Sequence, residues 1–174
     1  MNNTLTKEDV KNSIEVQWRK SQIKASLVVW FIIACVSLFI SFIFSLYNSE
    51  DISGAWLMAI AFWGLVFGSV SIFNLSKIKY IIKNHTSFTI HETCLDKFSI
   101  SYMNRGAIYY TIKIVEDGRT INVDTNPYFS NDLIANFKPE DYHGKNVVGL
   151  YDKTTHKFYI IKWVDWINYN IKDK

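Results

Sequence analysis

The side chains best suited to bind a metal or to transfer protons are scattered along this 174-residue chain. The four histidines are His85, His91, His143 and His156. No two of them have the close spacing that places a pair of metal ligands on one helical face. The two cysteines, Cys35 and Cys94, form no close pair either. We therefore expect no metal site and, because these cysteines fall in separate parts of the chain, no disulfide.

The carboxylates of the second half also lack the arrangement of an acid–base pair. Asp117, Asp124, Asp132, Asp141 and Asp152 stand in or beside expected turns, where a carboxylate accepts hydrogen bonds from backbone amides. "HGK" at residues 143–145 lacks the preceding glycine of a phosphate-binding loop and is better interpreted as a turn. No Gly-x-Ser-x-Gly elbow and no set of kinase motifs occurs. We expect no catalytic residues, no cofactor and no enzyme activity.

The organisation of the chain around these residues is dominated by two long apolar stretches. Residues 25–47 and 53–73 contain no charged side chain. As helices they would be about 34 Å and about 31 Å long, enough to cross a bilayer. The first is too long for the core of a cleaved signal peptide, and a second follows at once. A pair of buried helices in a soluble core is disfavoured by the same length, so we predict a membrane hairpin over residues 25–76.

Basic residues lie before the first apolar stretch and after the second, but not between the two. Lys7, Lys11, Arg19, Lys20 and Lys24 precede the first stretch, and Lys77, Lys79 and Lys83 follow the second. The connector between them has no Lys or Arg, and its acidic pair is Glu50 and Asp51. Because the side richer in Lys and Arg normally stays in the cytoplasm, we expect a multi-pass protein of the inner membrane with both termini cytoplasmic.

Small residues recur at helical spacing in both stretches and predict the face along which the helices pack. They are Ala34, Ser37, Ser41, Ser45, Ala61, Gly64, Gly68 and Ser71. In an antiparallel pair we expect Ser37 near Gly64 and Ala34 near Gly68. The alternative is a homodimer through "GLVFG", residues 64–68, which fits the small-xxx-small pattern. Neither stretch has an Asp, Glu, His, Lys or Arg side chain, which argues against an ion pathway or a transporter site.

Aromatic and basic residues near the ends of these stretches are expected at the membrane interface. They are Trp18, Arg19, Lys20, Lys24, Tyr47, Trp56, Lys77, Lys79, Tyr80 and Lys83. Residues 1–24 have the pattern of an amphipathic helix, with Thr6 as its cap. Either one face of this helix rests on the membrane, or the helix simply extends the first span with its charges in water.

After a basic linker, residues 77–85, the pattern changes to the alternation of β-strands over residues 86–174. Six short strands with turns between them predict one antiparallel sheet curled into a small barrel or sandwich. Asp117 and Gly118 form the expected turn of the first long hairpin, and residues 153–156 form the second. A short helix is expected within residues 130–137, and the C-terminal segment from Trp163 has helical, amphipathic spacing.

The order "EDGR", "TNPYF", "DYHGKNVVGLYD" and "KFYII", within residues 110–161, resembles the C-terminal β-domain of uncharacterised bacterial two-span inner-membrane proteins. The resemblance implies a bacterial inner-membrane protein with a membrane hairpin and a small β-domain. It implies no catalytic residue, since that family has no known function.

A membrane anchor joined to a folded module predicts a protein that binds or regulates a partner protein at the inner leaflet. Candidate contacts are Tyr109, Tyr128, Phe129 and Tyr142. The alternatives are an immunity protein against a membrane-acting toxin and an oligomeric, channel-like membrane protein. The net charge of +3 is largely explained by the residues that flank the membrane, so nucleic acid is not an expected partner.

Overall fold

The structure is a computed structural model that describes residues 5–47, 53–101, 107–116, 118–129 and 139–164. The connector with Glu50 and Asp51, the short helix expected within residues 130–137 and the C-terminal segment from Asp165 lie outside the described residues. The described chain has three α-helices, two 3-10 turns and six strands.

The first helix, α1 (Lys7–Lys11), is short and separate from the second, α2 (Ile14–Tyr47). Thr6 caps α1 through a reciprocal pair of hydrogen bonds, because its hydroxyl accepts from Asp9 N at 3.1 Å while the Asp9 carboxylate accepts from Thr6 N at 2.9 Å. The Ser13 hydroxyl accepts from Val16 N at 3.2 Å, at the start of α2. The expected N-terminal helix is thus divided, and its second part continues directly into the first apolar stretch.

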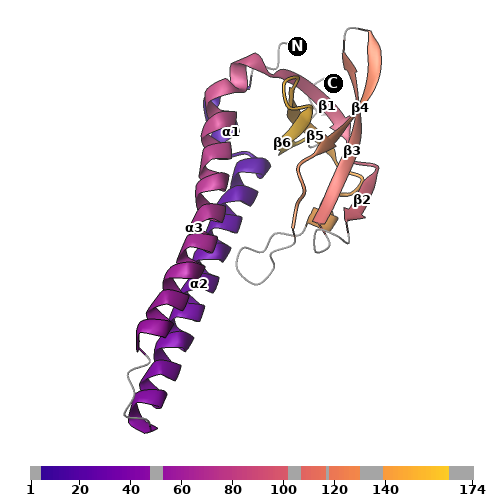
Figure 1. Ribbon diagram of the computed structural model, residues 1–174. Coiled ribbons are helices and arrows are strands. Elements are labelled where there is room, and N and C mark those ends of the chain that lie inside the picture. The colour runs from indigo at the N-terminus through magenta and orange to yellow at the C-terminus, as the bar shows by residue number, and fades with distance from the viewer. Residues whose placement is uncertain (1–4, 48–52, 102–106, 117, 130–138, 165–174) are drawn as a thin grey trace, which may run out of the picture.

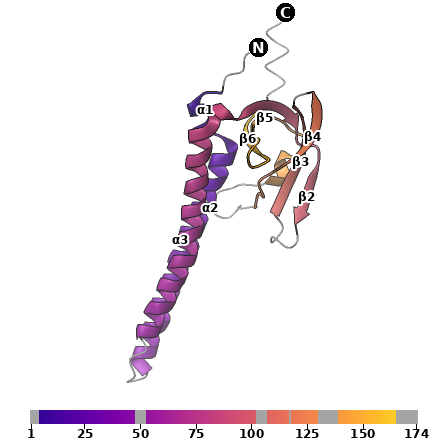
Figure 2. The same cartoon turned by 45° about the horizontal axis from the view of Figure 1, so that its top comes forward.

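The third helix, α3 (Ser53–Asn84), runs antiparallel beside α2 (Figures 1 and 2). It extends well past the second apolar stretch, so the expected linker over residues 77–85 is mostly helical. We call α2 and α3 together the hairpin. Both helices are long and apolar enough to cross a membrane, and only 6% of the most apolar stretch of each is buried in the protein. Their large apolar side chains face outward, as in Phe31, Phe39, Leu65 and Ile72.

The six strands form one sheet in the order β1-β5-β6-β4-β3-β2. Their bounds are β1 (Thr89–Cys94), β2 (Phe98–Ser101), β3 (Ala107–Glu116), β4 (Arg119–Thr125), β5 (Asn146–Asp152) and β6 (Lys157–Trp163). Two long apolar helices followed by six strands confirm that part of the prediction. The β-domain comprises these strands and the segments between them.

The prediction of an antiparallel barrel or sandwich was wrong in two respects. The chain leaves β4, crosses over and returns as the β5–β6 hairpin, so that β6 lies parallel to β4 and the sheet is mixed. The sheet also curls without closing. The Thr93 hydroxyl of β1 reaches the Lys113 carbonyl of β3 at 3.3 Å, but β1 and β2 remain the two outer strands.

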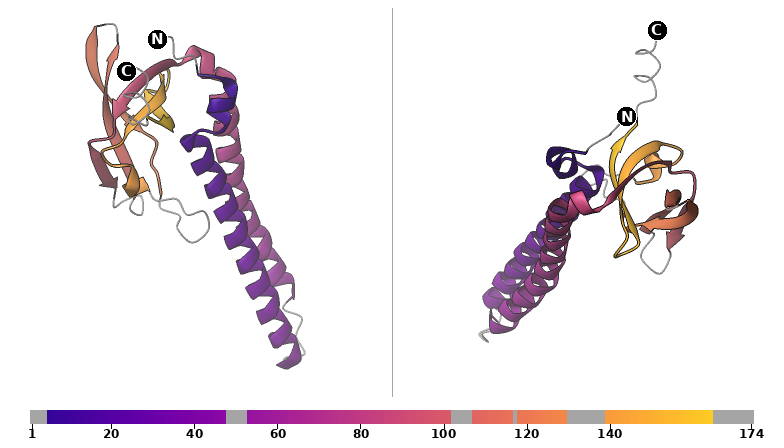
Figure 3. Two further views of the ribbon diagram at one scale, coloured as in Figure 1. Left: turned by 180° about the vertical axis from the view of Figure 1, so that it is seen from behind. Right: turned by 90° about the horizontal axis from the view of Figure 1, so that it is seen from above.

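The β5–β6 hairpin is buried on both of its faces, which explains its continuous rather than alternating apolar pattern. One face contributes Phe158 and Ile160 to the core inside the curled sheet. The other contributes Leu150 and Tyr159 to a second core with Val10, Ile81 and Phe88, which come from the helices and the segment that follows them. The β-domain therefore packs beside the end of the hairpin where α1 lies, while the opposite end extends away from it (Figure 3).

Candidate functional site

A buried ion pair lies in the first turns of α2, where the hairpin meets the β-domain. Arg19 stands four residues after Glu15, so the two side chains lie on the same helical face. The Arg19 guanidinium approaches one Glu15 carboxylate oxygen at 2.7 Å from Nη2 and 2.9 Å from Nε. Glu15 is 0% exposed and Arg19 is 3% exposed. Both charges are thus withdrawn from water and depend on each other for compensation.

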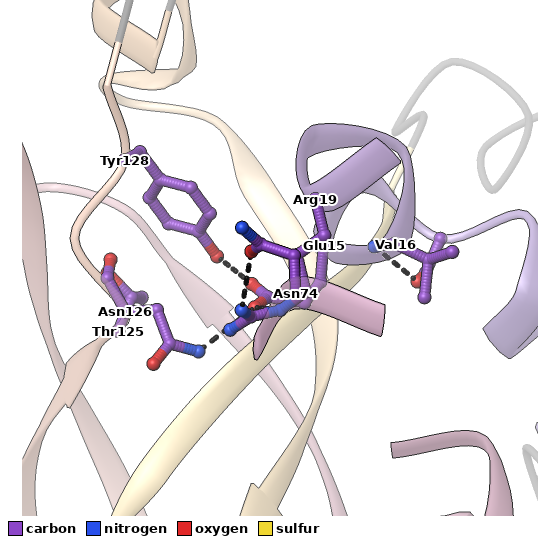
Figure 4. Close-up of polar contacts among 8 residues, drawn as sticks. Glu15, Val16, Arg19, Asn74, Thr125, Asn126 and Tyr128 are labelled. Atoms are coloured by element: carbon purple, nitrogen blue, oxygen red, sulfur yellow. Dashed lines mark hydrogen bonds and ion pairs between the residues drawn. The ribbon is translucent and has the colours of Figure 1, made fainter. Parts of the chain in front are cut away.

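Three side chains from distant segments complete the environment of this pair (Figure 4). The Tyr128 hydroxyl donates to Glu15 Oε2 at 2.6 Å, and Asn126 Nδ2 donates to Glu15 Oε1 at 3.0 Å. Arg19 Nη1 donates to Asn74 Oδ1, on α3, at 3.2 Å. We call Glu15, Arg19, Asn74, Asn126 and Tyr128 the junction network. It joins both helices of the hairpin to the segment that follows β4.

The junction network holds its tyrosine in the protonated state. Burial, the neighbouring Glu15 carboxylate and the hydrogen bond to it raise the pKa of Tyr128 well above its ordinary value. The ring of Tyr128 also packs edge-on against Trp18, with ring centroids 5.0 Å apart. Because each Glu15 oxygen already accepts a hydrogen bond, the chemistry of this arrangement is that of a satisfied structural ion pair.

A second polar contact fixes the C-terminal end of α3 to the β-domain. The Tyr80 hydroxyl donates to Asp152 Oδ2 at 2.9 Å. Asp152 also accepts from Thr154 N at 2.9 Å and from the Thr155 hydroxyl at 2.7 Å, within the β5–β6 turn. Burial opposes ionisation of this carboxyl group, but the hydrogen bonds outweigh it and lower the pKa of Asp152.

A pocket of about 310 Å³ opens beside the junction network, between the hairpin and the segment after β4. We call it the junction pocket. It is lined by Trp18, Arg19, Gln22, Val70, Phe73, Asn74, Lys77, Asn126, Pro127 and Phe129. Trp18 Nε1 and Gln22 Nε2 are buried and have no hydrogen-bond partner among the described residues. The pocket is therefore lined both by side chains that carry an unpaired donor and by apolar side chains.

The residues predicted to pack the two helices occupy different environments. Ser37 and Ser71 are buried, and the Ser71 hydroxyl contacts that of Ser26 at 2.9 Å. Ala34, Ser41, Gly64 and Gly68 are half-buried, whereas Ser45 and Ala61 are exposed. A Cβ atom at Gly64 would lie 3.1 Å from Trp30 Nε1, and one at Gly68 would meet nothing within 4 Å. Trp30 is therefore the side chain nearest to Gly64.

The residues predicted at the membrane interface divide into two groups. Trp18 and Arg19 are buried at the junction, because the β-domain covers the face of α2 that we expected to meet head groups. Lys20, Lys24, Lys79 and Lys83 are exposed, and Trp56, Lys77 and Tyr80 are half-buried. Tyr47 is the last residue of α2.

The predicted partner contacts are less exposed than expected. Tyr128 is completely buried in the junction network and is not available to a partner. Tyr109, Phe129 and Tyr142 are half-buried, and Tyr142 packs edge-on against Trp163 with ring centroids 4.5 Å apart.

Sequence reasoning missed Glu15, Asn74 and Asn126. The four-residue spacing of Glu15 and Arg19 around Trp18 was the available signal for a buried pair on an apolar helical face.

Comparisons with protein-family models, with curated proteins and with solved structures found no match for this chain. Among the described residues, no group of three or more His, Cys, Asp or Glu side chains is placed to hold a metal ion. The features that bear on function are therefore the hairpin, the junction network, the junction pocket and the surface of the β-domain.

Proposed function

We propose that this chain is a non-enzymatic protein of the bacterial inner membrane that presents its β-domain to a partner protein at the cytoplasmic surface. The observation that carries this proposal is the junction network, which fixes the β-domain to one end of an otherwise lipid-compatible hairpin. A module held this firmly has a defined height and orientation above the membrane, which favours recognition of a partner.

The distribution of basic residues supports the cytoplasmic orientation. Lys20, Lys24, Lys79 and Lys83 are all exposed, and they lie in the first turns of α2 and the last turns of α3, at the end of the hairpin that packs against the β-domain. Positive charge near the ends of membrane spans favours the cytoplasmic side. The β-domain then lies at the inner leaflet, beside the N-terminal end of α2 and the C-terminal end of α3.

The outer strand β2 is the surface best suited to a partner. It pairs with β3 on one side and with no other described strand on the other. Phe98 and Ile100 on β2 are 43% and 45% exposed. The strand lies on the side of the sheet away from the hairpin (Figure 1). An open edge with exposed apolar side chains can accept an added strand from another protein.

Purification of the tagged full-length protein in a mild detergent tests this proposal. We expect a partner to co-purify in stoichiometric amount, and Ile100→Lys to release it by placing a charge at the contact. Val115→Lys is the matched control, because Val115 is also apolar and is 64% exposed, but lies near the tip of the β3–β4 hairpin. Persistent recovery of the bare protein, or equal loss with both variants, would contradict the proposal.

An oligomeric, channel-like protein is the second candidate. Gly68 favours it, since the space where a Cβ atom would lie is empty to 4 Å and leaves a small-residue surface open on α3. Ion flux through liposomes that contain the inserted protein would support this candidate, and a tight membrane would exclude it.

A further inference from the structure

We propose that the junction pocket binds the phosphate head group of an anionic phospholipid, with an acyl chain along its apolar wall. This inference rests on the proposed membrane location and adds a specific ligand to it. The pocket is lined by residues just before the first apolar stretch and at the end of the second. When the helices cross a bilayer, this level coincides with the lipid head groups.

Two of the side chains that line the junction pocket carry donors that the protein itself leaves unused. Trp18 is 4% exposed, and its Nε1 has no acceptor among the described residues. The Nε2 of Gln22 is buried and unpaired in the same way. A buried donor without an acceptor destabilises the folded protein. Phosphate oxygens accept several hydrogen bonds at once and would supply the missing acceptors.

The charge at the junction pocket favours an anion. Arg19 is neutralised by Glu15, whereas Lys77 has no carboxylate partner in the part of the chain that the structure describes. The Lys77 ammonium instead lies over the rings of Phe73 and Tyr80, at 5.7 Å and 5.9 Å from their centroids. None of the described residues that line the pocket is acidic. A lysine ammonium in this setting is a suitable point charge for phosphate.

The apolar part of the junction pocket favours a lipid over free phosphate. Val70 and Phe73 line the pocket and are also 42% and 58% exposed on α3. The wall is therefore continuous with the helical surface that faces the lipid chains. Phe129 lines the pocket from the β-domain side. An anionic head group and an acyl chain fill both parts, whereas inorganic phosphate fills only one.

Lipid binding to the full-length protein, purified in a mild detergent and stripped of lipid, tests this inference. Native mass spectrometry and thermal unfolding are measured with phosphatidylglycerol, phosphatidylcholine and inorganic phosphate as separate probes. We expect phosphatidylglycerol to bind and to raise the melting temperature, with phosphatidylcholine weaker and inorganic phosphate without effect at the same concentration. An equal shift with inorganic phosphate would overturn the assignment to a lipid.

Two variants test whether the junction pocket is the site. Lys77→Gln should weaken phosphatidylglycerol binding about tenfold, because it removes a charge-assisted hydrogen bond. Lys79→Gln removes the same charge from an exposed position on the same helix and should leave binding unchanged. Equal losses would show that the lipid is held only by diffuse charge and would overturn the proposal.

Gln22→Leu separates a ligand-binding role from a structural one. The substitution removes an unpaired buried donor, so the lipid-free protein should melt at the same temperature or higher. The stabilisation by phosphatidylglycerol should nevertheless fall. A lower melting temperature without lipid, together with unchanged lipid binding, would contradict the proposal.

Carbonate extraction of membranes distinguishes this inference from the proposed function. If the chain is released from the membrane by carbonate, the membrane location itself fails. If the chain is retained but shows no preference for phosphatidylglycerol, only the lipid site fails.

Discussion

At the scale of single residues, the junction network depends on a carboxylate that no catalytic pattern identifies. Glu15 accepts hydrogen bonds from Arg19, Asn126 and Tyr128 while it is completely buried. Its negative charge compensates the only cation of the junction network. Loss of one member of such a pair leaves the other charge buried without compensation, which costs more than the pair contributes.

Glu15→Ala should therefore lower the stability of the folded protein by about 3–5 kcal/mol. Thermal or denaturant unfolding of the full-length protein in a mild detergent measures this loss. Glu8→Ala is the matched control, because the exposed Glu8 carboxylate makes a 3.5 Å ion pair with Lys11 and accepts a 3.3 Å hydrogen bond from Asn12 Nδ2, both at the surface. That substitution should cost less than about 1 kcal/mol. Similar losses for the two variants would show that the junction network does not anchor the β-domain.

Asp152 should make the protein sensitive to acid. Its folded-state pKa is lowered by hydrogen bonds that include those from Thr155 and Tyr80, despite the opposing effect of burial. A lowered pKa gives stability that is present above the unfolded-state value of about 4 and is lost as the pH falls through the folded-state value. The melting temperature should thus be steady between about pH 7 and 5 and fall below about pH 4.

Asp152→Asn should flatten this acid-induced loss, because the side chain no longer binds a proton. Asp96→Asn, at an exposed position outside the β5–β6 turn, is the control and should retain the wild-type profile. Melting curves from pH 7 to 3 compare the three proteins. An unchanged acid transition in Asp152→Asn would assign the sensitivity to other groups.

At the scale of elements, local patterns were enough to predict the two long helices and the six strands. Uncharged stretches as long as residues 25–47 have few structural alternatives, and the alternation around Ile112 and Ile114 fits a half-buried strand. The turn at Gly118, with φ at 75°, follows from the freedom of glycine at positive φ.

Contacts between distant elements could not be predicted from these patterns. The parallel pairing of β4 and β6 depends on the crossover that brings the β5–β6 hairpin between β1 and β4. The place of Trp30 against Gly64 depends on the register of two helices, which small residues alone do not fix. Glu15 and Tyr128 lie more than a hundred residues apart in sequence, so only the fold brings them together.

Gly149 is the position where an element depends on the absence of a side chain. It stands next to the irregularity in the β5–β6 register, and a Cβ atom there would lie 2.2 Å from the Phe158 ring and 2.6 Å from the Tyr159 carbonyl. Gly149→Ala should destabilise the β-domain by about 1–3 kcal/mol through overpacking. Gly68→Ala, where a Cβ atom meets nothing within 4 Å, should change the melting temperature little. Equal effects would contradict the close approach at Gly149.

At the scale of the whole molecule, the β-domain and one end of the hairpin act as a single packed unit. The core inside the curled sheet includes Trp18 of α2, and the second core includes Val10 of α1 and Ile81 of α3. Removal of either the β-domain or the helices should therefore expose, on the part that remains, apolar residues of these shared cores. The partner surface proposed on β2 lies on the side of the sheet away from the hairpin (Figure 1), whereas the lipid site proposed at the junction pocket lies between the hairpin and the segment after β4.

Cysteine accessibility in intact cells tests the central claim most directly, because that claim is a hairpin that crosses the membrane twice and leaves the β-domain in the cytoplasm. Single cysteines are introduced as Ser49→Cys, in the connector, and Ser99→Cys, at an exposed position of β2, after Cys35 and Cys94 are replaced by alanine. A membrane-impermeant maleimide should label Ser49→Cys in intact cells and Ser99→Cys only after permeabilisation. Labelling of Ser99→Cys in intact cells, with Ser49→Cys protected, would contradict the orientation.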